Sequence, residues 1–172
     1  DRMRGVLDEL LNFSRPLGEL SLERVAAGAL LRELTTLHEG IAVQRDVAIA
    51  DPPAAAAGIA LRCDPRKIKQ ALVNLLQNAL EAAPRGGTVG WVARADEAGV
   101  VLGVHDDGPG FSPRLLDRAA DPGVTTKPTG SGIGLSVCRA IARQHGGRLV
   151  LRNRPAGGGE ALLELPRRQE PA

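Results

Sequence analysis

The sequence of 172 residues contains very few aromatic side chains: one Trp, two Phe and no Tyr. Nucleic-acid surfaces usually combine basic stripes with aromatic residues, whereas the Arg residues here are scattered, so we expect no nucleic-acid partner. The net charge of +2 is small and indicates little about other partners. Apolar residues still make up 43% of the chain, which predicts a packed domain with a core of Leu, Val, Ile and Ala.

Long apolar runs and paired cysteines are also missing. No stretch approaches the roughly 18 residues that a membrane-spanning helix needs, and no signal peptide is recognisable. Cys63 and Cys138 belong to no Cys-x-x-Cys pair, so we expect reduced thiols in a cytoplasmic domain. Because the chain begins at Asp1 rather than Met, we expect it to be a piece of a longer protein. A membrane segment of that protein, if it has one, would lie upstream of Asp1.

Hydrophobic periodicity predicts the helices. The clearest helix begins after Asp64, an N-cap that Pro65 follows at the first helical position, and it ends before Pro84. Two more are predicted over about 26–39 and about 133–144, the latter closed by Gly146 and Gly147. Residues 1–16 show the same periodicity and are expected to be the end of a further helix.

Strands are predicted between these helices. Their ranges are 20–25, 43–50, 88–95, 100–105, 149–153 and 161–165, the last four forming two hairpins. Residues 51–58 and 106–132 lack periodicity and are expected to be loops, and the tail from Arg167 is expected to be disordered. The pattern predicts an α+β two-layer sandwich, with one mixed or mostly antiparallel sheet covered on one face by three helices.

The helix after Asp64 carries a polar stripe opposite its apolar face. Gln70, Asn74 and Asn78 recur at four-residue spacing and project together, flanked by Gln77 and Glu81. An exposed helix face normally carries Lys and Glu, whereas neutral amides can coordinate a ligand without adding charge. An amide oxygen suits Mg²⁺ that is held mainly by phosphates. On this segment alone, a merely polar surface explains the stripe equally well.

An acidic, glycine-rich segment follows the predicted strand at 100–105. In Asp106-Asp-Gly108-Pro-Gly110 the carboxylate stands at a strand end, and the glycines allow the backbone to approach a planar ligand. Asp106 could then accept a hydrogen bond from an exocyclic amine, as in adenine. Taken by itself, an ordinary Asp-Gly turn is the better explanation.

A second glycine-rich segment opens the helix at about 133. Its backbone offers N–H groups and the positive end of the helix dipole to phosphates, and Thr125, Thr126 and Lys127 add hydroxyl donors and a cation. The Rossmann fingerprint fits poorly because position 135 is Leu rather than a third Gly and no strand precedes the glycines. The Gly-Lys-Ser/Thr of a Walker A loop is absent.

The order of the three segments resembles the catalytic, ATP-binding domain of histidine kinases, in the superfamily shared with gyrase, the Hsp90 chaperones and MutL. Residues 70–82 resemble its N box, residues 106–110 its G1 box and residues 130–135 its G2 box, and 139–147 is similar to the helix that follows. The resemblance covers about residues 20–166 and is closest to the nitrogen-regulation and sporulation kinases. It implies a Bergerat-type ATP-binding fold with ATP and Mg²⁺ as cofactors.

The resemblance also implies roles for single residues. Asn78 would ligate Mg²⁺ through its amide oxygen, with Asn74 beside it near the phosphates. Asp106 would bind the adenine amine, with Gly108 and Gly110 passing close to the base. Asn74, Asn78 and Lys127 are the candidate catalytic residues. The lid over the triphosphate would be formed by Thr125, Thr126, Lys127, Gly130, Ser131, Gly132, Ile133, Gly134 and Leu135.

The reaction implied is transfer of the ATP γ-phosphoryl group to a histidine nitrogen, for relay to an Asp of a response regulator. The position four residues before the Mg²⁺ ligand is typically Glu in the gyrase, Hsp90 and MutL branch, where it can take a proton from water. Here it is Asn74, an amide without useful basicity, which favours transfer over hydrolysis. The alternatives are a catalytically silent ATP-binding regulatory module and, less favoured, an ATPase of this superfamily.

The acceptor histidine is not recognisable in this chain. His38, His105 and His145 lack the His-Glu context of an acceptor and are interpreted as structural. Residues 1–17 resemble the end of the second helix of the dimerisation and histidine phosphotransfer domain, so the acceptor is expected upstream, in a homodimeric parent protein. Residues 18–168 would then be the catalytic domain and 169–172 a disordered tail.

The lid segment departs from the family pattern. Pro122-Gly123-Val124 stands where family members often carry Pro-Phe-Phe before Thr-Thr-Lys. Those aromatic residues normally help to anchor the lid, and Gly123 adds backbone freedom. We therefore expect a mobile lid and a modest affinity for nucleotide.

Overall fold

The computed structural model describes residues 19–118 and 133–167. The expected helix at 1–16 and the segment that carries Thr125, Thr126, Lys127, Gly130, Ser131 and Gly132 lie outside these ranges. So does the tail after Arg167. The elements, in chain order, are β1 (Glu23–Ala26), α2 (Ala27–Arg45), β2 (Ala48–Ile49), the 3₁₀ helix η1 (Ala54–Gly58), β3 (Ala60–Cys63), α3 (Pro65–Ala82), β4 (Thr88–Ala95), β5 (Gly99–Asp106), α4 (Pro113–Arg118), α5 (Ile133–Gln144), β6 (Arg148–Asn153) and β7 (Gly159–Pro166).

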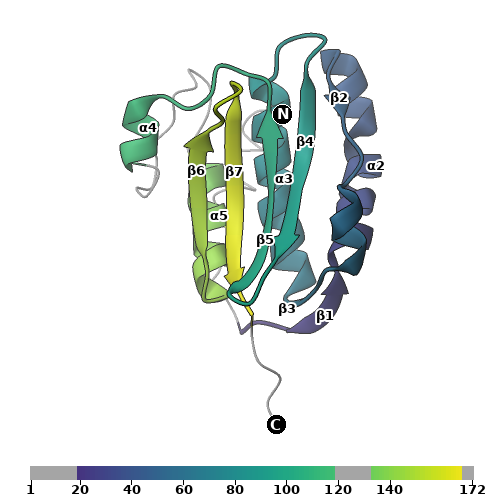
Figure 1. Ribbon diagram of the computed structural model, residues 1–172, viewed down its shortest axis with the longest axis vertical. Helices are drawn as coiled ribbons and strands as arrows, with labels where there is room; N and C mark the ends of the chain where they lie inside the picture. The colour runs from purple at the N-terminus through teal and green to yellow at the C-terminus, as the bar shows by residue number, and fades with distance from the viewer. Residues whose placement is uncertain (1–18, 119–132, 168–172) are drawn as a thin grey trace.

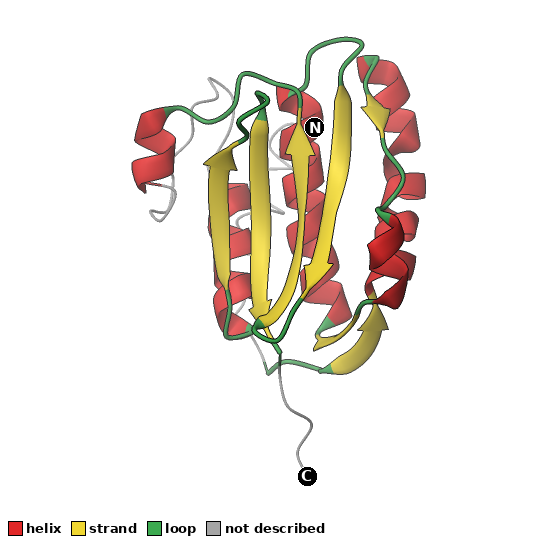
Figure 2. Ribbon diagram, in the orientation of Figure 1, coloured by secondary structure: helices red, strands yellow, loops and turns green. Residues whose placement is uncertain are grey.

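The elements form two layers. Five strands make one sheet in the order β2-β4-β5-β7-β6, in which only the β2–β4 pair is parallel. Helices α2, α3 and α5 lie against one face of this sheet (Figures 1 and 2). The predicted α+β sandwich, with a mostly antiparallel sheet covered on one face by three helices, is therefore confirmed.

Helix α3 forms where the sequence predicts it, for local reasons. The Asp64 carboxylate accepts hydrogen bonds from the backbone N–H groups of Arg66 (3.1 Å) and Lys67 (3.3 Å), and Pro65 occupies the first helical position. The helix ends at Ala82, two residues before Pro84. Its apolar face is buried and consists of Ile68, Ala71, Leu72, Leu75, Leu76, Ala79 and Leu80.

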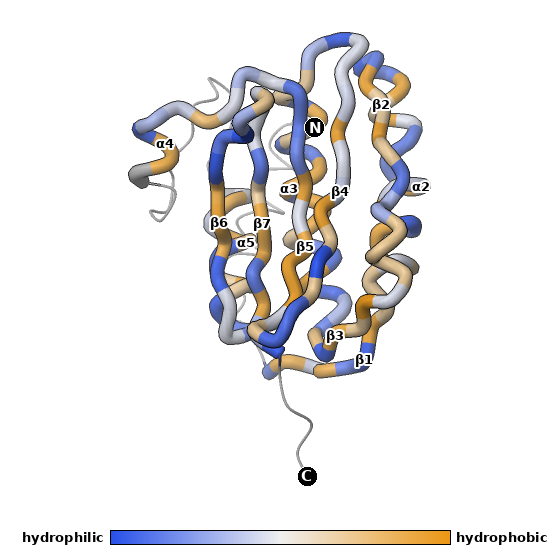
Figure 3. Tube along the Cα trace, in the orientation of Figure 1, coloured by the Kyte–Doolittle hydropathy of each residue, from blue (hydrophilic) through white to orange (hydrophobic). Residues whose placement is uncertain are grey.

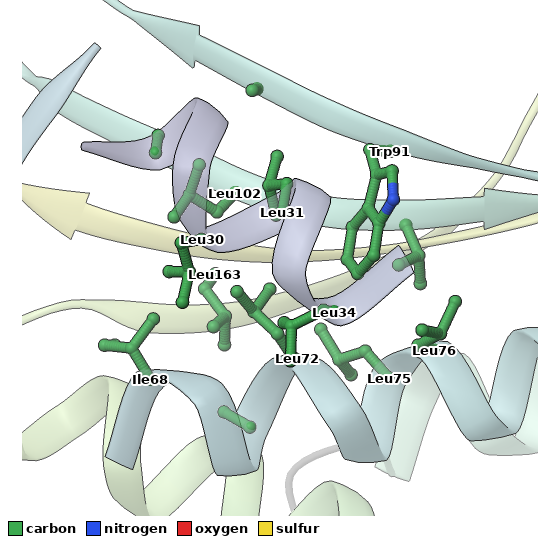
Figure 4. Close-up of a cluster of buried hydrophobic side chains, with 14 of the residues drawn as sticks. Leu30, Leu31, Leu34, Ile68, Leu72, Leu75, Leu76, Trp91, Leu102 and Leu163 are labelled. Atoms are coloured by element: carbon green, nitrogen blue, oxygen red, sulfur yellow. The ribbon is translucent and has the colours of Figure 1, made fainter. Parts of the chain in front are cut away.

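The core lies between the sheet and the helices (Figure 4). Labelled leucines of α2 and α3 point toward one another and toward Trp91, Leu102 and Leu163 on the strands. Each of these side chains loses nearly all its contact with water, and burying one large aliphatic side chain is worth about 1.5–3 kcal/mol. This packing holds α3, with its polar stripe, in a fixed place behind the sheet.

Several boundaries differ from the prediction. Helix α2 continues to Arg45, and only Ala48–Ile49 of the predicted strand 43–50 is extended. The helix ends because Asp46 adopts the left-handed conformation (φ 57°) and its N–H bonds back to Val43 O at 3.0 Å. The alternation that predicted a strand here includes Val43, whose side chain is in fact exposed on the helix.

Three short elements were not predicted. Strand β3 pairs with β1 in a separate two-stranded antiparallel sheet. The 3₁₀ helix η1 lies in the expected loop 51–58, and α4 lies in the expected loop 106–132. Elements of four to six residues show too few repeats for periodicity to reveal them.

One buried polar contact between α2 and the sheet gives a test of the fold. The Trp91 indole N–H donates to the Thr35 hydroxyl at 2.8 Å, and both residues are buried. Thr35→Val keeps the shape and leaves this donor without an acceptor, so we expect the free energy of unfolding to fall by about 1–3 kcal/mol. Urea unfolding followed by the fluorescence of the single Trp measures the change.

The adjacent exposed Thr36 offers a matched control for that experiment. Thr36→Val makes the same chemical change on the same helix, and we expect it to alter stability by less than about 0.5 kcal/mol. Equal effects of the two substitutions would mean that the loss reflects helix propensity rather than the hydrogen bond to Trp91.

Candidate functional site

The Asp106 carboxylate lies at the upper end of β5, the end at which β6 also stops (Figure 1). The residue is buried, with 6% of its surface exposed. Its Oδ1 accepts hydrogen bonds from the backbone N–H groups of Gly108 (2.8 Å) and Gly159 (3.3 Å). No hydrogen bond from the described residues reaches its Oδ2. One oxygen therefore fixes the carboxylate, and the other can accept a hydrogen bond from a ligand.

Gly108 and Gly110 allow the loop to approach other parts of the protein closely. A Cβ on Gly108 would lie 2.5 Å from the Ala82 carbonyl oxygen, at the end of α3. A Cβ on Gly110 would lie 2.6 Å from Oδ1 of Asn153, and the φ of Gly110 is +78°. Both glycines are therefore required by contacts within the chain. The expected contact of Gly108 and Gly110 with an adenine base stays a prediction.

Asn74 and Asn78 lie one turn apart on α3, and both are partly buried. Asn74 faces α5, because its Cγ lies 3.9 Å from the position of a Cβ on Gly134. Next to it, the Cys138 thiol of α5 donates to the Ala71 carbonyl oxygen of α3 at 3.3 Å. Burial raises the pKa of Cys138 to about 12, and the Asn74 amide opposes the rise. The polar stripe therefore borders α5, which begins at the last residues of the expected lid.

Helix α3 connects the described parts of the three predicted segments. Gly108 touches its C-terminal end, and Gly134 lies beside Asn74 in its middle. Ile133, Gly134 and Leu135 form the first turn of α5, and Leu135 packs against the core. Segments that are far apart in the sequence thus meet around one helix, as a common ligand site requires.

Three side chains beyond the predicted set make contacts beside this site. Arg154 donates to the Asp106 carbonyl oxygen at 3.3 Å and lies 3.7 Å from the Asp107 carboxylate. Asn153 contacts the loop at Phe111 through both of its amide atoms. Asp107 accepts from the Thr88 N–H at 3.0 Å. The sequence predicts a turn between the strands at 149–153 and 161–165, but no local pattern shows which loop that turn contacts.

His105 precedes Asp106 on the other side of the sheet. Burial lowers the pKa of His105, and the positive charge of Arg154 lowers it further, while the carboxylates of Glu160, Asp107 and Asp106 oppose the shift. Its Nδ1 has no hydrogen-bond partner among the described residues. The imidazole is therefore neutral at neutral pH and packs over Gly90, where a Cβ would collide with the ring.

His38 and His145 are buried and hydrogen-bonded. His145 Nε2 accepts from the Asp64 N–H at 3.0 Å, so its Nδ1 carries the proton and donates to Ile141 O at 2.7 Å. This contact ties the end of α5 to the start of α3. All three histidines occupy packed positions, in keeping with a structural role.

The described residues contain no cluster of three or more His, Cys, Asp or Glu side chains that could hold a metal ion. The polar stripe offers amide oxygens, which suit Mg²⁺ that is held mainly by phosphates. Within 19–118 and 133–167, no helix has the length and apolar character needed to cross a membrane. Cys63 and Cys138 are both free thiols, as predicted.

Known proteins resemble this chain over most of its length. Residues 63–169 match the family of histidine kinase-, DNA gyrase B- and HSP90-like ATPases. The chain is 32% identical over 166 residues to the sensor histidine kinase ZraS of Escherichia coli. This match covers 96% of this chain and 35% of ZraS. It is 28% identical over 161 residues to sporulation kinase C of Bacillus subtilis, covering 94% of this chain and 37% of that kinase. The chain thus spans about a third of these relatives.

Solved structures agree with these matches. The catalytic domain of histidine kinase ThkA superposes with a TM-score of 0.76 at 29% identity, covering 86% of this chain and 96% of that domain. Full-length ShkA in complex with AMPPNP gives a TM-score of 0.82 at 27% identity, covering 99% of this chain and 37% of ShkA. ThkA in complex with the response regulator TrrA gives a TM-score of 0.77 at 27% identity, covering 97% of this chain and 48% of the ThkA chain.

Proposed function

Because the chain belongs to the family of histidine kinase-, DNA gyrase B- and HSP90-like ATPases, we propose that its parent protein transfers the ATP γ-phosphoryl group to a histidine. The chain itself is the ATP-binding catalytic domain of a histidine kinase. The acceptor belongs to a phosphotransfer domain of the same protein, of which residues 1–17 would be the last part. A response regulator is the next acceptor, and a relative, ThkA, forms a complex with such a protein.

The Asp106 carboxylate is the observation that carries the nucleotide site. It is buried, its Oδ1 is held by two backbone N–H groups, and its Oδ2 is left to accept a further hydrogen bond. Adenine presents an amino group at position 6, whereas guanine presents a carbonyl that a carboxylate would repel. The fixed oxygen therefore favours ATP and ADP over guanine nucleotides.

The polar stripe of α3 fits the phosphate side of the same ligand. Asn78 would hold Mg²⁺ through its amide oxygen, and Mg²⁺ when bound neutralises charge on the phosphates. Asn74 and the first turn of α5 border this position, and Lys127 with the lid residues 125–135 would complete it. The protein's contribution is to position the nucleotide and to exclude water.

Asn74 also favours transfer over hydrolysis. Its amide cannot take a proton from water near neutral pH. A neutral imidazole already has a lone pair and needs no such base. The acceptor histidine would belong to the parent protein, which would be a homodimer. Transfer does not depend on whether that protein is anchored in a membrane.

A titration of the chain with ADP, with Mg²⁺ and with EDTA, tests the proposal. We expect Mg²⁺ to strengthen ADP binding at least about tenfold, because the ion screens phosphate charge near the protein. Asn78→Ala is expected to bring this ratio close to one. Gln77→Ala, at the adjacent exposed position, should leave it unchanged. Failure of the unmodified chain to bind ADP at all would refute the nucleotide site.

Phosphotransfer needs the longer parent protein. With ATP labelled at the γ-phosphate, a kinase forms acid-labile, base-stable phosphohistidine upstream of this chain. A catalytically silent module binds ATP without labelling, and an ATPase of the superfamily releases phosphate continuously from this chain alone. Either of the last two results would contradict the proposed reaction.

A further inference from the structure

The carboxamide of Asn153 pairs with the backbone of Phe111 as a neighbouring strand would. Its Oδ1 accepts from the Phe111 N–H at 2.6 Å, and its Nδ2 donates to the Phe111 carbonyl at 2.9 Å. Asn153 is the last residue of β6, in the polar upper end of that strand (Figure 3). One side chain therefore satisfies both polar groups of a loop residue that belongs to no strand.

The loop is shaped to receive this side chain. Gly110, next to Phe111, has a φ of +78°, and a Cβ there would lie 2.6 Å from Oδ1 of Asn153. Any other residue at 110 would push the carboxamide away from Phe111. Gly110 and Asn153 therefore fit one another across 43 positions of sequence.

The contact between Asn153 and Phe111 is connected to the Asp106 carboxylate through Gly159. The Phe111 ring lies 3.0 Å from the position of a Cβ on Gly159, and the Gly159 N–H donates to Asp106 Oδ1 at 3.3 Å. Arg154, next to Asn153, donates to the Asp106 carbonyl. The turn between β6 and β7 thus holds the loop at both of its ends, residues 106 and 111.

We propose that Asn153 is a positioning residue for the nucleotide site, which holds the loop 106–111 in the conformation that binds adenine. This inference rests on the proposed function. Asn153 does not contact the ligand; it acts through Phe111 and Gly110. Without the hydrogen bonds from Asn153 to Phe111, the loop adopts the adenine-binding conformation for only a fraction of the time. The apparent affinity for nucleotide falls in proportion to that fraction.

Asn153→Ala tests the proposal with two measurements. We expect the Kd for Mg-ADP to rise about tenfold, as it would if the competent loop were populated about a tenth of the time. Without nucleotide, hydrogen exchange should become faster across residues 106–116 and stay unchanged in α3. Asn153→Asp keeps the acceptor for the Phe111 N–H and loses the donor, so its effect should lie between those of Asn and Ala.

Arg152→Ala is the matched control. Arg152 is the exposed preceding residue of β6, on the other face of the sheet, where it pairs with Glu160. It should change neither affinity nor exchange.

The outcomes separate the two ideas. If the unmodified chain binds Mg-ADP and Asn153→Ala binds it equally well, the positioning role is wrong and the proposed function stands. If affinity falls but exchange accelerates throughout the protein, Asn153 is only structural and the inference is overturned. If the unmodified chain binds no nucleotide, the proposed function fails and the positioning role fails with it.

Discussion

Asp106→Asn is expected to weaken the binding of Mg-ADP about 100-fold while leaving the fold intact. The Asn side chain keeps an oxygen for the N–H groups of Gly108 and Gly159. It places an NH₂ group where Oδ2 stood, so that a donor faces the adenine amine. A hydrogen bond to a charged group is worth about 1.5–3 kcal/mol, and each 1.4 kcal/mol is tenfold in affinity. Calorimetric titration measures the loss, and thermal unfolding without nucleotide checks the fold.

The neighbouring Asp107 offers the same substitution at a different contact. Its carboxylate is half exposed and bonds Thr88 N–H and Arg154 rather than the position expected for the ligand. Asp107→Asn should change the Kd by less than about threefold. Asp106→Asn should also lower the preference for ADP over GDP, because its NH₂ can donate to the guanine carbonyl. A variant at 106 that keeps both affinity and preference would show that the base binds elsewhere.

Local chemistry explains why α3, α5 and the two hairpins could be predicted from the sequence. The N-cap Asp64, Pro65 and the long apolar face of α3 all act within one segment. The glycine turns at 86–87 and 146–147 are also marked locally, because Gly86 and Gly146 both take positive φ, a conformation that favours glycine. The prediction of the two-layer fold follows from these elements.

Contacts between distant segments explain what the sequence could not show. Strand β3 exists because residues 60–63 pair with 23–26, and β2 because residues 48–49 pair with 88–89. No pattern within four residues reveals such partners. Val43 was predicted to lie in a strand although it is exposed on α2, because alternation of apolar and polar residues does not show what a side chain contacts.

The sequence predicted candidate ligand-binding residues, but not the side chains that support them. Asp106 and the amides of α3 stand in recognisable segments, whereas Asn153 and Arg154 act on a loop more than 40 positions away. The sequence predicts that Gly110 passes close to a base, and the structure adds that a Cβ there would collide with Asn153. A single sequence shows that a glycine is present but not which neighbour requires it.

Asp64→Ala is expected to destabilise the fold by about 3 kcal/mol, because one buried carboxylate holds three backbone N–H groups. Its Oδ2 accepts from Ser21 at 3.1 Å, and its Oδ1 accepts from Arg66 and Lys67 at the start of α3. Losing an N-cap costs about 0.5–2 kcal/mol, and each buried group left unpaired adds to this. In a chain of this size, the melting temperature should fall by roughly 6–12 °C.

Asp96 provides the comparison for a carboxylate that caps backbone in an exposed turn. It accepts from the N–H groups of Ala98 and Gly99 at 2.8 and 3.1 Å. Water can replace it there, so Asp96→Ala should cost less than about 1 kcal/mol. A similar loss at both positions would mean that burial does not set the strength of the Asp64 contacts.

The pH dependence of stability separates the charge of Asp64 from its shape. Burial alone would raise the pKa of Asp64, but the hydrogen bonds from Ser21, Lys67 and Arg66 and the charge of Arg66 lower it overall. A carboxyl whose pKa is lower in the folded state stabilises the fold above its unfolded value, near 3.9, and loses that effect as the pH falls through the folded value. Asp64→Asn should therefore be clearly less stable than the unmodified chain at pH 7, and the difference should shrink below about pH 4. A difference that stays constant from pH 7 to pH 3 would show that the uncharged amide, and not the missing charge, causes the loss.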